Sequence, residues 1–73
     1  MATKVLFDTE NLSMRETQLV NALLSTQMTY RAGLLRAAGM SSSDPNFQSA
    51  VAQFAVDFMA GAFPDLNFRL VAE

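Results

Sequence analysis

The segment from Ser13 to Gly39 carries the start and stop signals of one long helix, and no proline interrupts it. Ser13 and Glu16 have the spacing of a capping box. In this motif the serine hydroxyl accepts from the backbone N–H of Glu16, while the carboxylate accepts from the N–H of Ser13. Gly39 lies where a left-handed C-terminal cap favours a residue without Cβ. These signals predict a helix over residues 13–38.

A short polar connector follows and predicts that the chain reverses its direction. Residues 41–44 are polar, and Pro45 comes directly after them. Ser43 or Asp44 can serve as an N-cap, and Pro45 suits the first helical position, where the N–H that it lacks would have no partner. We therefore expect a second helix over residues 45–62. It should lie antiparallel to the first, because short connectors join neighbouring helices.

Both ends of the chain are predicted to form short strands. Residues 3–8 combine β-branched and aromatic side chains before a polar turn. Residues 66–71 alternate apolar and polar side chains, so that Leu66, Phe68 and Leu70 should face inward. The predicted fold is one mainly α domain in β-α-α-β order. The strands pair with each other beside the hairpin or, since two strands alone make a weak sheet, with a second copy.

Each predicted helix has more apolar surface than one partner can cover. At 100° per residue, the apolar arc of the first helix covers about half of its circumference and divides into two stripes. The Leu19 stripe consists of Leu19, Leu23, Tyr30 and Leu34. The Val20 stripe consists of Val20, Leu24, Met28, Leu35 and Ala38, and Gln27 and Arg31 lie between the two stripes.

The second helix shows the same duplication. The Phe47 stripe consists of Phe47, Val51, Phe54 and Phe58, and its heptad-like spacing predicts that it forms the core of the hairpin. The Ala52 stripe lies farther around the same helix and consists of Ala52, Val56, Met59 and Phe63.

Two interpretations of the additional stripes follow. In the first, the terminal strands of the same chain cover them. In the second, they meet another protein, since methionine and aromatic side chains are favoured in interface cores. The second interpretation predicts a partner interface made of Val20, Leu24, Met28, Arg31, Leu35, Val56, Met59 and Phe63.

Association is the reinforcement that remains open to so small a chain. Its 73 residues include no cysteine and no histidine, so disulfides and zinc sites with nitrogen or sulfur ligands are excluded. Hydrophobic residues make up 51% of the chain and charged residues 16%, compared with about 25% charged residues in typical soluble domains. We therefore expect a homo-oligomer.

Two side chains that enzymes often use, histidine and cysteine, are missing. Without histidine or cysteine there is no imidazole base and no thiolate nucleophile. Asp8 and Glu10 form a lone acidic pair, which we interpret as a solvated turn. The three glycines are isolated from one another, so no phosphate-binding loop is indicated. We expect no catalytic activity, no cofactor and no metal.

The charge and hydropathy of the chain limit which binding partners and which cellular compartment are expected. A net charge of −2, with one lysine and four arginines, argues against general nucleic-acid binding. Polar residues interrupt every stretch of about 20 residues, so we expect no membrane span. The N-terminal residues lack the apolar run of a secretory signal. The expected location is the cytoplasm of a bacterium, or of the host cell for a viral protein.

Three functional hypotheses follow from these observations. The first is a non-enzymatic protein–protein interaction module, a small homo-oligomeric assembly subunit. The second is a regulatory binder of another protein, such as a phage-type inhibitor or a chaperone. The third, ranked last, is a small DNA-binding repressor or antitoxin, whose affinity for DNA would weaken steeply with salt.

Overall fold

The computed structural model describes residues 3–72 and confirms the β-α-α-β order. Two helices form an antiparallel hairpin, and a short strand flanks it at each end. The elements are β1 (Thr3–Leu6), α1 (Met14–Ala37), α2 (Phe47–Ala62), the 3₁₀ helix η1 (Pro64–Leu66) and β2 (Arg69–Ala72).

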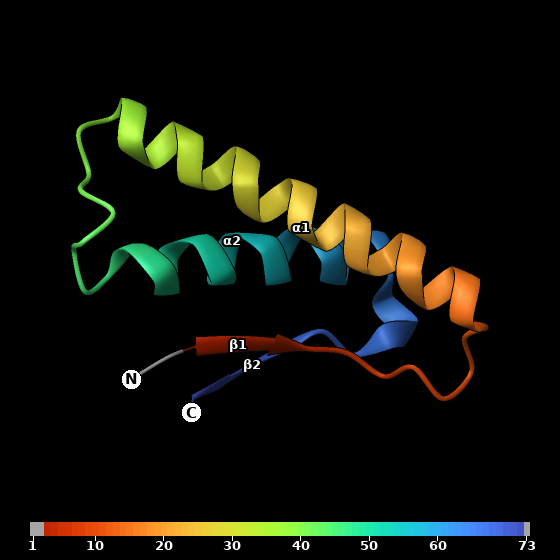
Figure 1. Ribbon diagram of the computed structural model, residues 1–73. Coiled ribbons are helices and arrows are strands. Elements are labelled where there is room, and N and C mark those ends of the chain that lie inside the picture. Colours follow the sequence, from red (N-terminus) through yellow and green to blue (C-terminus); the bar gives the residue numbers. More distant parts are fainter. Residues whose placement is uncertain (1–2, 73) are drawn as a thin grey trace.

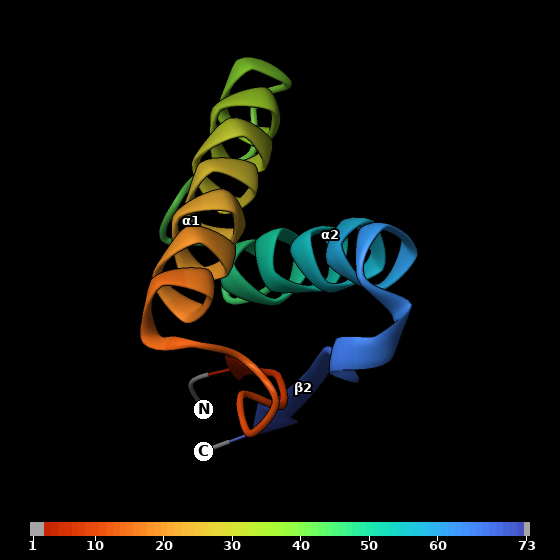
Figure 2. The same ribbon diagram turned by 90° about the vertical axis from the view of Figure 1, so that its right-hand side faces the viewer.

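The elements form three layers with α2 in the middle (Figure 1). Helix α2 contacts α1 on one side and both strands on the other, whereas α1 contacts neither strand. The two helices cross at an angle, so they separate towards the end of the hairpin where α1 begins and α2 ends (Figure 2). Only α2 is therefore covered by other elements on two sides.

The core lies on both sides of α2. It is a cluster of buried apolar side chains: Val20, Leu24, Ala55, Val56, Met59 and Phe68. Half-buried residues of the chain ends pack against this cluster, among them Leu66 and Leu70. The inward orientation predicted for Leu66, Phe68 and Leu70 is thus confirmed.

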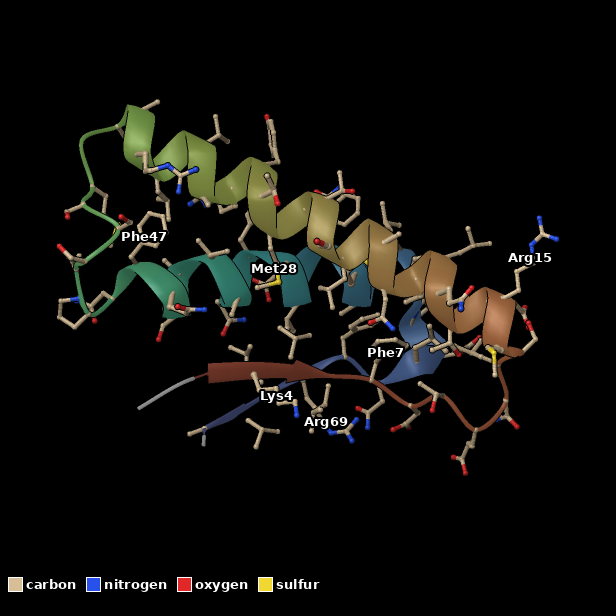
Figure 3. All side chains as sticks on the ribbon, in the orientation of Figure 1. Lys4, Phe7, Arg15, Met28, Phe47 and Arg69 are labelled. Atoms are coloured by element: carbon tan, nitrogen blue, oxygen red, sulfur yellow. The ribbon has the colours of Figure 1, made fainter. Side chains whose placement is uncertain are left out.

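The two strands pair with each other within the chain and form an antiparallel ribbon. Val5 lies opposite Leu70 in this ribbon, and both side chains pack on the core. The rings of Phe7 and Phe68 stack with their centroids 4.9 Å apart. Figure 3 shows Phe7 pointing into the interior, while Lys4 and Arg69 lie on the outer side of the ribbon. The ribbon thereby covers the face of α2 that α1 leaves open.

Both ends of α1 have the predicted caps. Glu16 N donates to Ser13 Oγ at 3.0 Å, and Ser13 N donates to Glu16 Oε1 at 2.9 Å, which completes the capping box. At the other end Gly39 has a φ of 96°, and Met40 N donates to the carbonyl of Leu35 at 3.0 Å. This is the Schellman pattern of a left-handed cap.

The predicted start of α2 is wrong by two residues. The helix begins at Phe47 with Asn46 as its N-cap, and Pro45 lies in the turn before it. Asp44 Oδ1 instead accepts from the backbone N–H of Asn46 at 2.8 Å. Aspartate favours such local turns, and here the turn holds the chain outside the helix for two further residues.

The observed strands are shorter than the predicted strands 3–8 and 66–71, and the second begins later in the chain. The first ends at Leu6, and the second begins at Arg69 because η1 occupies Pro64–Leu66. Asn67 follows η1 with a φ of 53°, in the left-handed region. Asparagine tolerates the left-handed conformation better than most residues do. A residue in that conformation cannot be part of an extended strand.

Two glycine substitutions should act in opposite directions on stability. A Cβ at Gly33 would meet no atom within 4 Å, so Gly33→Ala should stabilise the fold by about 0.5–1 kcal/mol through helix propensity. Gly39→Ala should destabilise it by about 1–2 kcal/mol because alanine is strained at positive φ. Urea denaturation followed by circular dichroism measures both. Equal effects of the two variants would contradict this description of α1.

The capping box should make stability depend on pH. The backbone N–H of Ser13, and then its hydroxyl, lower the pKa of the Glu16 carboxyl. The ionised carboxylate therefore stabilises the fold above its usual pKa, and this contribution is lost as the pH falls through the lowered pKa. In urea denaturation at pH 7 and about pH 3, Glu16→Gln should reduce the loss of stability in acid. The control Glu10→Gln, at an exposed position before the helix, should leave that loss unchanged.

Candidate protein-interaction surface

Half of the predicted interface residues lie in the chain's own core. The exposed fraction is 7% for Val20, 8% for Leu24, 8% for Val56 and 0% for Met59. The ribbon packs over the Ala52 stripe, and α2 packs against the Val20 stripe. For the Ala52 stripe the structure thus supports the first interpretation, in which the terminal strands of the same chain cover it. These four side chains are not accessible to a partner in the folded chain.

The other four predicted residues are half-buried and do not form one exposed face. Met28 and Phe63 pack against the core, and Figure 3 shows Met28 directed towards α2. The guanidinium of Arg31 lies 4.8 Å from the centre of the Phe54 ring, which is a cation–π contact between the helices. Its Nε is buried without a hydrogen-bond partner. Leu35 completes the set.

Substitutions at a core position and at an exposed position should separate the two kinds of residue. Met59→Ala removes a fully buried side chain and should destabilise the fold by about 2–5 kcal/mol through the cavity that it leaves. Leu19→Ala, where the leucine is 62% exposed, should change the stability of the monomer by no more than about 0.5 kcal/mol. Denaturation measured at the lowest workable protein concentration tests both. A mild effect of Met59→Ala would contradict its placement in the core.

The exposed apolar surface lies on the other stripe of α1. The exposed fractions are 62% for Leu19, 59% for Tyr30 and 42% for Leu34, and Leu23 between them is half-buried. These residues follow one another at helical spacing along a single face. Large apolar side chains exposed singly are normal, but a row of them along one helix is a typical interaction site.

The Phe47 stripe is only partly core. Phe47 and Val51 are buried as predicted, but Phe58 is 44% exposed. The crossing of the helices is the reason, since they separate towards the last turns of α2 (Figure 2).

An apolar groove adjoins the Leu19 stripe at the same end of the hairpin. It has a volume of about 520 Å³, and it lies between the first half of α1 and the chain that follows α2. Leucines of the stripe form one wall, and apolar residues at the end of α2 and in η1 form the other. Its apolar lining includes Leu12, Leu19, Leu23, Phe63, Pro64 and Leu66, and the carboxylates of Glu16 and Asp65 border it. The groove and the stripe therefore form one continuous apolar surface.

Of the charged side chains of α1, only Glu16 borders the groove. The Glu16 carboxylate, at its end, is engaged in the capping box. Arg31 and Arg36 both lie over rings of α2, at 4.8 Å from Phe54 and 5.9 Å from Phe47. Arg15 extends away from the first turn (Figure 3). The surface is therefore suited to apolar contacts rather than to recognition of a charged ligand.

The described part of the chain has no feature of a metal site or a membrane span. Residues 3–72 contain no group of three or more carboxylates that could hold a metal ion. Over the same range, neither helix combines the length and apolar character needed to cross a membrane.

Comparison with protein-family models, with curated proteins and with solved structures gave no match to this chain.

Proposed function

We propose that this protein is a non-enzymatic protein–protein interaction module, a small homo-oligomeric assembly subunit that uses the Leu19 stripe of α1. One observation carries the proposal. Other elements of the chain cover both stripes of α2 over most of their length, whereas α1 leaves large apolar side chains exposed on its second stripe.

The total surface of the chain supports the proposal. A compact monomer of 8.0 kDa exposes about 4450 Å². This chain exposes 4935 Å², about 500 Å² more. The chain is therefore less compact than an average monomer of its mass. An additional partner on α1 would cover surface of this size.

The small size of the chain gives association a physical benefit. A domain of this length buries only about 60% of the surface of its unfolded chain. It has no disulfide, because the sequence contains no cysteine. A partner that binds the folded state stabilises it by mass action. Self-association would thus support both the fold and the assembly.

The second candidate function is that of a regulatory binder, and the groove favours it. A groove of about 520 Å³ beside a helix can accept apolar side chains from a different protein. The DNA-binding hypothesis gains no comparable support, because Arg31 and Arg36 contact aromatic rings instead of forming a basic face.

A charge in the stripe should weaken self-association. Tyr30→Glu places a carboxylate at a 59% exposed position of the proposed contact, so burying it against a partner would be costly. The affinity between subunits should fall at least tenfold, as measured by sedimentation velocity over a range of concentrations. Ser25→Glu is the matched control, since Ser25 is exposed on the opposite side of α1. Circular dichroism verifies that both variants are folded.

The state of the unmodified protein decides between the two candidate functions. A defined oligomer that Tyr30→Glu dissociates and Ser25→Glu does not would support the assembly subunit. A wild-type chain that remains monomeric at every concentration would contradict it and favour the regulatory binder.

A further inference from the structure

We propose, building on the function proposed above, that α1 packs antiparallel against α1 of a second copy, across a twofold axis that passes between Thr26 and Gln27. The partner is thus a second copy of this chain, and the contact is the Leu19 stripe.

The spacing of the stripe is symmetric along the helix. Leu19 and Leu34 lie equally far from the midpoint between Thr26 and Gln27, and so do Leu23 and Tyr30. A twofold interface uses the same patch on both subunits, so that patch must be complementary to itself. Antiparallel pairing meets this requirement. It places Leu19 opposite the partner's Leu34 and Leu23 opposite the partner's Tyr30.

The position of the axis around the helix agrees with this register. At 100° per residue, Thr26 and Gln27 lie about 50° to either side of the centre of the stripe. The axis therefore passes through the same apolar face that the exposed side chains identify. Position 26 of one copy then lies beside position 26 of the other.

Electrostatics favour antiparallel over parallel pairing. Each helix has a partial positive charge at its N-terminus and a partial negative charge at its C-terminus. Antiparallel neighbours place opposite partial charges side by side, whereas parallel neighbours place like charges together. The groove gives a second reason. It lies beside the first half of the stripe, where only the antiparallel partner brings the other half of its own stripe, with Tyr30 and Leu34.

The stripe residues themselves are all uncharged, which favours a second copy over a charged partner. Between Leu19 and Leu34 the one charged residue is Arg31, which contacts the Phe54 ring, so two copies of this segment can meet without like-charge repulsion. Glu16 lies beyond the segment, at the groove. The stripe spans about 22 Å of helix, which is short for a standard interface of about 800 Å² per subunit. We therefore expect a dimer whose population depends on concentration.

Single cysteines test this geometry directly, because the natural chain contains none. Thr26 is exposed and close to cysteine in size, so Thr26→Cys should fold normally. In the proposed dimer the two introduced thiols lie within reach of a disulfide, whose Cα atoms are usually less than about 7 Å apart. Under a glutathione redox buffer, Thr26→Cys should form covalent dimers at least tenfold faster than either control variant, as seen on non-reducing gels.

Two control variants fix the orientation and the face. Ala37→Cys lies on the same side of α1 but far from the axis, so its two thiols would be separated by about 30 Å along the helices. Ser25→Cys points to the opposite side. Neither should cross-link faster than random collisions allow. In a parallel dimer, Ala37→Cys would cross-link as readily as Thr26→Cys.

The outcomes separate this inference from the proposed function. Selective cross-linking of Thr26→Cys supports the antiparallel pair. Equal cross-linking of Thr26→Cys and Ala37→Cys overturns it in favour of parallel pairing. If the wild type sediments as an oligomer but Thr26→Cys does not cross-link, the geometry is wrong and the assembly function stands. A monomeric wild type with no cross-linking removes both.

Discussion

The fold depends on the burial of α2 against two different layers. Met59, Ala52 and Ala55 have no exposed surface, and the two alanines are small enough to let the neighbouring elements approach closely. Both α1 and the ribbon pack on α2, and Val20 and Leu24 of α1 share one buried cluster with Phe68 beside the ribbon. Loss of packing on either face of α2 would therefore weaken the whole cluster, and the three layers should unfold as one cooperative unit.

The sequence predicts local features of this fold better than those decided by competing turns. The capping box and the Gly39 cap involve residues within five positions of one another, so their spacing is sufficient to locate the ends of α1. The start of α2 depends on whether Asp44 caps the helix or closes its own turn, and both are ordinary uses of aspartate. Spacing alone does not decide between them.

The sequence also predicts that each helix has two apolar stripes, but not which stripe stays exposed. That depends on which helix the ribbon covers, and the pairing of Thr3–Leu6 with Arg69–Ala72 joins opposite ends of the chain. The numbers of charged residues in the two helices could have predicted which helix the ribbon covers. Asp57 is the one charged residue of α2, whereas α1 has four, and the helix with fewer charges is the better candidate for the middle layer.

The proposed dimer would give α1 the environment that α2 already has. In one chain the layers are ribbon, α2 and α1, and α1 is the outermost layer with one apolar stripe exposed. Joining two copies through α1 would continue the stack as ribbon, α2, α1, α1, α2 and ribbon, so that every helix is covered on both sides. The surface that is excessive for a monomer of this mass would then be buried within a larger common core. Folding and association would be coupled, and the stability of the chain would increase with its concentration.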